Sequence, residues 1–239
     1  CVLIGFAFGM FNGWMVSYMS VPPFIISMAS MNIAKGIASV FTKTQSVSWP
    51  LGSDPVNGWF RNLVSYKGFP VGLVIFLAVA VICGIILYNT KPGRYILCLG
   101  SNSEAVRLSG VNTKKWRMLA YVICGVLAGI AGLVASSRIY SADANNIGLN
   151  LEMDAILAVA LGGNFLGGGK FSLIGSVIGA YTIQALTTTL YAMNVKADQL
   201  PVYKAIVVVI IVTLQSDVFK KYIANLKAKK SVAAEGGQK

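Results

Sequence analysis

The sequence predicts an all-α membrane protein, a polytopic helical membrane bundle with about seven spans. The chain is 56% hydrophobic and only 12% charged, whereas soluble domains carry about 25% charged residues. Several uncharged runs also approach the ~20 residues that are needed to cross the hydrocarbon core of a bilayer. Almost all Lys and Arg residues fall in the joints between these runs. A water-soluble fold could not bury so many long apolar segments at once.

Six apolar runs are long enough, or nearly long enough, to form spans. They are 1–18, 23–42, 70–88, 116–135, 171–192 and 201–216. A seventh run, 155–166, has only about 12 residues, which favours a broken or partly re-entrant helix. We count it as a crossing because the predicted orientation requires one.

The distribution of basic residues predicts the orientation, because cytoplasmic loops are enriched in Lys and Arg. With loop 89–115 and the segment after 216 inside, 13 basic residues are cytoplasmic and 6 are external. Loop 43–69 carries interfacial aromatic residues and is then expected outside. We therefore expect a transmembrane domain over 1–216 and a basic cytoplasmic tail over 217–239.

The composition argues against several other classes of protein. The formal net charge of +12 does not indicate nucleic-acid binding, because the basic residues are not gathered on a soluble face. Four Cys without CxxC spacing, in a chain without His, predict neither disulfides nor a structural zinc site. The Gly-rich stretch 162–170 is not a phosphate-binding loop, because Phe171 follows Lys170 where Ser or Thr is required.

Glycine recurs at every fourth position in three apolar runs. This spacing lets helix backbones approach closely in lipid. We expect tight packing within one subunit, with a subunit interface as the alternative. The three stripes are Gly5–Gly9–Gly13, Gly125–Gly129 and Gly175–Gly179.

Charged residues near or inside the apolar runs have two interpretations each. Glu152 and Asp154 follow Asn150, which is typical of a helix start with a side-chain cap and acidic residues at the positive end of the helix dipole. The same carboxylates could instead accept hydrogen bonds from sugar hydroxyls. A paired-carboxylate glycosidase is discounted because no soluble cleft is expected. Lys35 either snorkels to the interface or lines a pathway.

Loop 91–117 has more local structure than a plain connection needs. Ser101 and Glu104 fit a capping box, and Gly110 is placed to end a short helix over about 102–109. Asn112 or Thr113 can then cap the next span, and Glu104 can pair with Arg107. Ala105 and Leu108 form a small apolar face on this helix. We expect the face to dock onto a cytoplasmic partner, with a helix resting on the membrane surface as the alternative.

Three long stretches resemble one protein family. The strings are GSNSEAVRLSGVNTKKWRMLAYVICGVLAGIAGL, LEMDAILAVALGGNFLGGGKFSLIGSVIGA and NGWMVSYMSVPPFIISMASMNIAKGIA. They resemble the ribose-type family of ABC sugar importer permeases over nearly all of residues 5–216. The stretch SADANNIGLNLEMDAILAV and the ending VTLQS are most similar to its galactofuranose-importer branch.

The resemblance implies a non-catalytic, multi-pass permease subunit in the bacterial inner membrane. Two such subunits, identical or related, would form a pathway for a galactofuranose-like, galactose-like or ribose-like monosaccharide, working by alternating access. An extracytoplasmic binding protein would deliver the sugar. Cytoplasmic ABC ATPase subunits would bind ATP and Mg, so this subunit is expected to need no cofactor. Surrounding lipid is expected and nucleic acid is not.

The resemblance also suggests site residues in two groups. The ATPase-coupling residues are expected to be Gly100, Asn102, Glu104, Ala105, Arg107, Leu108 and Gly110. The substrate pathway is expected to involve Asn12, Asn145, Asn146, Glu152, Asp154 and Gln184.

Two departures from the family pattern stand out. Family members usually carry further N-terminal spans with a GGIDLSVG-like motif, so we expect the chain to be a fragment. Asn164 stands where related sequences often have Thr, Ser or Gly, and the sequence gives no reason for it.

Two alternative functions remain at this point. An ion- or proton-coupled secondary transporter would need ionisable residues deep in the spans, and only Lys35 qualifies by sequence. A branched-chain amino-acid permease would differ only in substrate.

Overall fold

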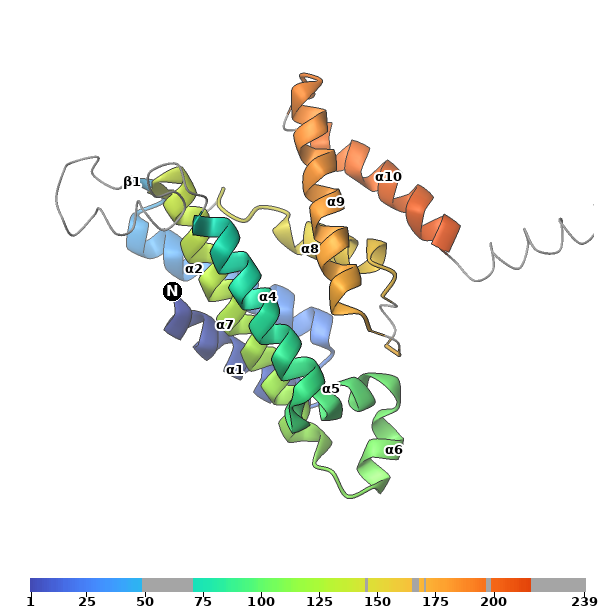
Figure 1. Cartoon of the computed structure of the whole chain (residues 1–239). Coiled ribbons are helices and arrows are strands. Elements are labelled where there is room, and N and C mark those ends of the chain that lie inside the picture. Colours follow the sequence, from blue (N-terminus) through green and yellow to red (C-terminus); the bar gives the residue numbers. More distant parts are fainter. Residues whose placement is uncertain (49–70, 145, 165–167, 170, 197–198, 216–239) are drawn as a thin grey trace, which may run out of the picture. The chain divides into compact units, whose positions relative to one another are not determined.

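The chain folds into helices gathered in two compact units, residues Cys1–Leu149 and Asn150–Lys239. The computed structural model describes residues 1–48, 71–144, 146–164, 168–169, 171–196 and 199–215 (Figure 1). The predicted tail over 217–239 and most of the predicted loop 43–69 lie outside the described residues.

The described residues of the first unit form four long helices, two short helices and one small strand pair. α2 begins with proline in its first turn and ends at Lys43, which adopts the left-handed conformation. The strands pair antiparallel, Val47 with Ala142 and Ser48 with Ser141. The elements are α1 (Val2–Tyr18), α2 (Pro23–Thr42), β1 (Val47–Ser48), α4 (Val71–Asn89), α5 (Lys91–Ser101), α6 (Ser103–Leu108), α7 (Thr113–Ile139) and β2 (Ser141–Ala142).

The described residues of the second unit form three helices, α8 (Leu151–Leu161), α9 (Leu173–Ala192) and α10 (Leu200–Gln215). α8 and α9 pack against each other, and α10 packs on both. The 11 residues of α8 extend only about 16 Å at 1.5 Å per residue. α8 is therefore too short to cross the hydrocarbon core alone, as the sequence predicted for this run.

The predicted helical membrane bundle is confirmed. Four described helices, α2, α4, α7 and α9, are long and apolar enough to cross a membrane, and the apolar α1 is slightly shorter. Large apolar side chains cover the outside of these helices; Leu3 is 82% exposed and Phe41 is 85% exposed. Lipid, unlike water, accommodates such a surface without penalty.

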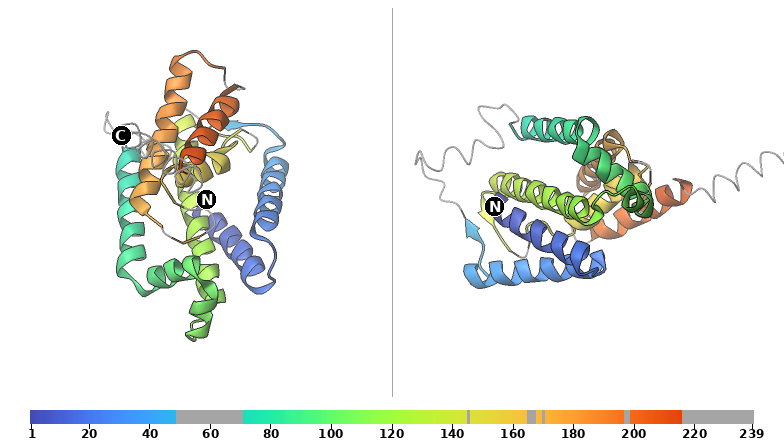
Figure 2. Two further views of the ribbon diagram at one scale, coloured as in Figure 1. Left: turned by 90° about the vertical axis from the view of Figure 1, so that its right-hand side faces the viewer. Right: turned by 90° about the horizontal axis from the view of Figure 1, so that it is seen from below.

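The glycine stripe on α1 packs against α7 within the same chain (Figure 2). A Cβ on Gly5 would overlap the carbonyl oxygen of Gly125, and a Cβ on Gly9 would lie 2.7 Å from the carbonyl oxygen of Tyr121. The two backbones can approach this closely only because side chains are absent at the crossing. The prediction of tight packing inside one subunit is thus confirmed for α1 and α7.

The same device joins α8 to α9. A Cβ on Gly179 would overlap the carbonyl oxygen of Ala158, and a Cβ on Gly175 would overlap that of Gly162. The third glycine stripe therefore also packs within the chain.

α5 was not predicted. In the sequence analysis, residues 91–101 are placed in the loop that precedes the short helix of the 91–117 segment. Thr90 caps its first turn by accepting a hydrogen bond from the Gly93 amide at 3.5 Å, and proline follows in the first turn. A polar cap followed by early proline is a helix-start pattern. That pattern, read together with the apolar spacing of Tyr95, Ile96 and Leu99, is the signal that could have located α5.

Candidate functional site

The first candidate site is the α6 segment, residues 100–110, between α5 and α7. Asn102 is extended, with φ −153° and ψ 97°. Its Oδ1 accepts hydrogen bonds from the amides of Glu104 at 3.1 Å and Ala105 at 3.0 Å. These two bonds satisfy backbone donors that a helix start leaves free. A short helix can form here because its first turn is capped in this way.

The end of α6 is set by Gly110, whose φ of +79° lies in the left-handed region. The Gly110 amide donates to the carbonyl oxygen of Arg107 at 3.1 Å, and the Ser109 hydroxyl donates to that of Val106 at 2.8 Å. Glycine adopts this conformation without the steric cost that a side chain would add. The predicted role of Gly110 as the helix terminus is confirmed.

The side chains of α6 divide into an inner and an outer set. Val106 is buried, whereas Leu108 is 79% exposed and Ala105 is exposed as well. Arg107 and Glu104 form the predicted i,i+3 ion pair at 2.6 Å, and both side chains are largely exposed. The predicted Ala105/Leu108 face is therefore presented outward on a helix held by Val106.

The predicted capping box is wrong by one residue. Ser101 is the last residue of α5, and Asn102 rather than Ser101 caps α6. Because α5 continues through Ser101, the chain becomes extended only at Asn102. For the cap of α7, the sequence left Asn112 and Thr113 as alternatives. The structure shows Asn112, whose Oδ1 accepts a hydrogen bond from the Lys115 amide at 3.3 Å. Gly100 lies exposed in α5, next to the α6 segment.

The second candidate site is the turn between α8 and α9, which is organised by Asn164. This buried side chain is 7% exposed. Its Oδ1 accepts from the Ser172 amide at 2.6 Å, and its Nδ2 donates to the Ser176 hydroxyl at 2.8 Å and to the Ser172 carbonyl oxygen at 3.2 Å. A buried polar group is stable only when its hydrogen bonds are made. Asn164, unexplained by the sequence, therefore ties the start of α9 to the end of α8.

We predict that Ser176→Ala destabilises this turn modestly. The substitution removes the shortest hydrogen bond donated by the Asn164 amide, at a cost of about 1 kcal/mol. Thermal unfolding of the detergent-solubilised protein measures the change. Ser27→Ala is the matched control, because the exposed Ser27 hydroxyl bonds only locally, to the Phe24 carbonyl oxygen. Equal stability of the two variants would contradict the assigned role of Asn164.

An ion pair joins α8 to α10 in the second unit. The Lys204 Nζ lies 2.6 Å from the Asp154 Oδ2, and the two side chains are 14% and 25% exposed, respectively. Asp154 belongs to the first turn of α8. Removing both charges from water strengthens their mutual attraction. Lys204 lies near the start of α10 and Asp154 near the start of α8, so this pair does not place a further ionisable residue deep in a span.

The predicted cap at Asn150 is only partly right. Asn150 occupies the N-cap position of α8 with a φ of +63°, but its side chain makes no capping hydrogen bond. Its carbonyl oxygen accepts from the Asp154 amide at 3.1 Å. The left-handed backbone at Asn150 turns the chain into the helix, whereas the sequence suggested a side-chain cap.

The remaining predicted pathway residues are distributed over both units. Asn12 lies on α1, with a buried Oδ1 that has no hydrogen-bond partner among the described residues. Asn146 donates to Asp143 at 2.7 Å, and Asn145 lies outside the described residues. Glu152 on α8 and Gln184 on α9 are exposed. Their assignment to a pathway stays a prediction.

A cavity of about 260 Å³ lies between α1 and α2. Its lining residues Ala7, Phe8, Phe11 and Ile33 are all apolar. Sugar recognition needs convergent polar groups, so this cavity does not have the chemistry of a sugar site. Lys35 is half-buried on α2, and the choice between snorkelling and pathway lining stays open.

Comparison with known proteins places these features in a family. Residues 1–214 match the protein family described as branched-chain amino acid transport system / permease component. The chain is 37% identical over 97% of its length to the fructose import permease protein of Bifidobacterium longum. It is 34% identical over 94% of its length to the galactofuranose transporter permease protein of Escherichia coli. It is 33% identical over 89% of its length to the ribose import permease protein of the same species.

These alignments cover 65%, 65% and 66% of the three relatives, respectively. The chain thus spans less than two thirds of the length of the curated relatives it matches. No solved structure matches the chain. The family match covers both helical units and the α6 segment. The chain therefore belongs to this family of multi-pass membrane permease components, and the resemblance to ribose-type sugar permeases predicted from its motifs is confirmed.

Proposed function

We propose that the chain is the membrane-spanning permease subunit of an ATP-driven importer that carries a monosaccharide into the cell by alternating access. The observation that carries this proposal is the α6 segment. It is a capped helix between two spans, anchored by Val106 and presenting Ala105 and Leu108 outward. The names of the relatives, which specify fructose, galactofuranose and ribose, support a monosaccharide as the substrate.

In this proposal the α6 segment is the contact for a cytoplasmic ATPase. The ATPase subunits bind ATP and Mg²⁺ and perform the hydrolysis, so this subunit catalyses no reaction and holds no cofactor. A small helix with an exposed apolar side can enter a complementary groove. Closure of the ATPase pair would then displace α6, and α7, which begins directly after it, would receive the motion. A second permease subunit and an extracytoplasmic sugar-binding protein complete the proposed importer in the bacterial inner membrane.

The proposed orientation puts the α6 segment in the cytoplasm, and three contacts support a consistent sidedness. Lys114 at the start of α7 lies over the ring of Tyr18 at the end of α1, 5.7 Å from its centroid. β1 and β2 pair where α2 and α7 have ended. Asp154 and Lys204 join the starts of α8 and α10. In each case the orientation predicted from the Lys and Arg distribution puts both contacting segments on the same side of the membrane.

Cysteine labelling tests this orientation. We expect native Cys98, exposed on α5, to react with a membrane-impermeant maleimide only after the cells are permeabilised. An introduced Gln45→Cys should react in intact cells. Cys1, Cys83 and Cys124 are first changed to serine in both proteins, and Cys98 is changed as well in the Gln45→Cys protein, so that each carries one reactive thiol. Labelling of both sites from outside would exclude the proposed topology.

The alternative function is an ion- or proton-coupled secondary transporter of a small polar solute. The Asp154–Lys204 pair supplies ionisable groups that such a transporter would need. However, both residues lie near the starts of their helices rather than midway along them. ATP-coupled import is therefore the better supported proposal.

Reconstitution distinguishes the two functions. The protein is placed in vesicles together with its ATPase and binding protein, and uptake of radiolabelled fructose, galactose and ribose is measured. The proposal expects uptake of at least one sugar to require ATP and to persist when the proton gradient is dissipated by an uncoupler. Uptake that stops with the uncoupler and ignores ATP would establish the alternative.

A further inference from the structure

One end of the first unit carries a dense group of basic and aromatic side chains. We call it the basic aromatic cluster. The Tyr95 and Trp116 rings lie 5.0 Å apart, which joins α5 to the start of α7. The Lys114 ammonium lies over the Tyr18 ring, which brings in the end of α1. We define the cluster as the residues of these two contacts together with the basic residues that flank them along α5 and α7: Tyr18, Lys91, Arg94, Tyr95, Lys114, Lys115, Trp116 and Arg117.

α5 contributes an amphipathic surface to this cluster. Lys91, Arg94 and Cys98 are exposed along one side, whereas Tyr95 and Leu99 are half-buried on the adjacent side. The helix is also bent tightly onto the end of α4, because a Cβ on Gly93 would overlap the Leu87 carbonyl oxygen. A short amphipathic helix held against the end of a span is suited to the membrane interface.

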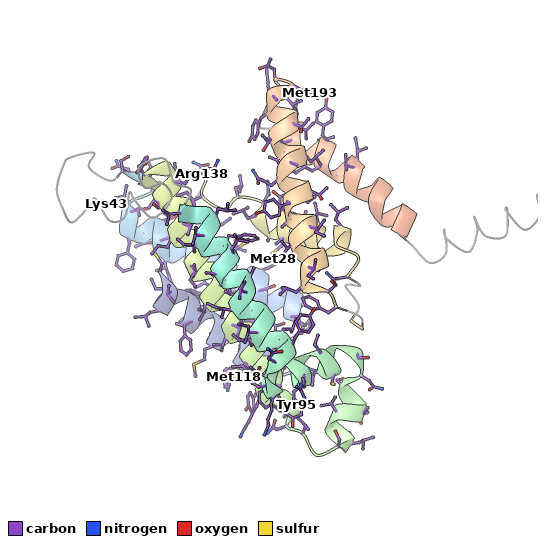
Figure 3. The ribbon with its side chains drawn as sticks, viewed as in Figure 1. Met28, Lys43, Tyr95, Met118, Arg138 and Met193 are labelled. Carbon is purple, nitrogen blue, oxygen red and sulfur yellow. The ribbon has the colours of Figure 1, made fainter. Side chains whose placement is uncertain are left out.

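The positive charges of the cluster have no carboxylate partner among the described residues. Within the described part of the first unit, the acidic residues are Glu104 and Asp143. Glu104 is paired with Arg107, and Asp143 follows β2, next to the Arg138 end of α7. In Figure 3, Tyr95 and Met118 lie at one end of this unit, whereas Lys43 and Arg138 lie at the opposite end.

Helix stability does not explain these cations either. Lys114, Lys115 and Arg117 occupy the beginning of α7, where the helix dipole is positive and added positive charge is unfavourable. Arg94 and Lys91 likewise lie in the first turn of α5. The charges are therefore expected to be compensated by a group that the described part of the chain does not provide.

We propose that the basic aromatic cluster binds the phosphate headgroup of an anionic phospholipid. Met118 lies in the apolar part of α7, and Lys114 lies about 6 Å before it along the helix axis. With Met118 at the edge of the hydrocarbon core, Lys114 is at the level of the headgroup layer, which is about 5–7 Å thick. Arg and Lys side chains bind phosphate through charge-assisted hydrogen bonds, and Trp and Tyr rings reside at the same depth. Basic pockets beside the ends of spans are suited to anionic headgroups.

A lipid fits this surface better than an acidic protein partner. The cluster adjoins the ends of α1, α4 and α7, and its cations are interleaved with interfacial rings. The α6 segment, by contrast, carries the outward-facing Leu108 and a charge pair that is internally neutral. The proposed ATPase contact is thus the α6 segment, and the proposed lipid contact is the basic aromatic cluster next to it.

Lipid binding to the full chain tests the proposal. The detergent-solubilised protein is titrated with phosphatidylglycerol and, separately, with phosphatidylcholine, and bound lipid is counted by native mass spectrometry. The wild type should bind phosphatidylglycerol selectively. The variant Arg94→Gln/Lys115→Gln should bind it about 10- to 30-fold more weakly, since each basic residue near an anionic surface contributes roughly 1 kcal/mol. Circular dichroism checks that the helical content is retained.

A matched variant, Lys43→Gln/Arg138→Gln, loses the same charge at the opposite end of the unit. It should keep wild-type affinity for phosphatidylglycerol. Quenching of Trp116 fluorescence by brominated phosphatidylglycerol, with the other tryptophans changed to phenylalanine, should fall only in the cluster variant.

Two results would overturn the proposal. One is equal affinity of both double variants for phosphatidylglycerol. Binding would then depend on the net charge of the protein and not on the position of the basic residues. The other combines two observations: the wild type binds phosphatidylglycerol and phosphatidylcholine equally, and the cluster variant no longer binds the ATPase. The cluster would then be a protein interface.

Discussion

Replacing Ala105 with glutamate is expected to abolish ATP-coupled sugar uptake without preventing insertion of the chain into the membrane. Ala105 is exposed on α6, on the same side as Leu108. Docking would bury this side against the ATPase, and the introduced carboxylate would be left there without a partner. Such a burial costs on the order of 3 kcal/mol, which corresponds to about 100-fold weaker association.

The measurement is sugar uptake and sugar-stimulated ATP hydrolysis in vesicles that contain the protein with the ATPase and the binding protein proposed as its partners. Ala105→Ser is the matched control, because it adds one small polar atom at the same place and no charge. The control should retain most of the coupled activity. Normal uptake by the glutamate variant would show that the α6 segment is not the docking site.

The second large effect is expected from Lys204→Met, which removes one partner of the ion pair between α8 and α10. The Asp154 carboxylate, 25% exposed in the pair, would remain partly buried and uncompensated. Breaking a fully buried pair costs about 3–5 kcal/mol, and the residual exposure here reduces the expected loss to roughly 2 kcal/mol. Thermal unfolding in detergent or nanodiscs should show this loss.

The double variant Asp154→Asn/Lys204→Met separates stability from transport. Because both charges are then absent, most of the lost stability should return. If Asp154 also contacts the sugar, uptake should remain impaired in the double variant although the fold is restored. Recovery of stability and uptake together would assign Asp154 to structure alone, and no recovery of stability would contradict the ion pair itself.

The membrane helices were predictable because their signal is local. α2, α4 and α9 begin and end within two residues of the apolar runs that predicted them. α7 extends beyond its predicted run at both ends, from Thr113 to Ile139, because Asn112 caps a turn that contains basic residues. Hydropathy marks the part of a helix in lipid and does not detect the polar turns that continue it.

The short elements were harder to predict because single side chains decide their limits. Ser101 and Asn102 are both good N-cap residues, and the sequence alone does not say which one is extended. The difference comes from α5, whose own cap at Thr90 sets where the helix begins and lets it run through Ser101. A missed helix thus shifted the predicted start of its neighbour.

The polar contacts of the second unit depend on positions far apart in the sequence. Asp154 and Lys204 are separated by 50 residues, and each was interpreted without the other. Asn164 bonds to Ser176 across 12 residues and a turn. Periodicity and hydropathy describe neighbours along one helix, so they contain no information on these pairs.

The crossing of α1 and α7 has a consequence for the synthesis of the chain. Nearly a hundred residues lie between Tyr18, where α1 ends, and Thr113, where α7 begins. At a translation rate of about 5–20 residues per second, α1 waits roughly 5–20 s in the membrane before its partner emerges from the ribosome. During that interval the Gly5 and Gly9 surface is open to other helices in the bilayer. Correct assembly therefore requires either a chaperoning neighbour or weak enough early contacts for α7 to displace them.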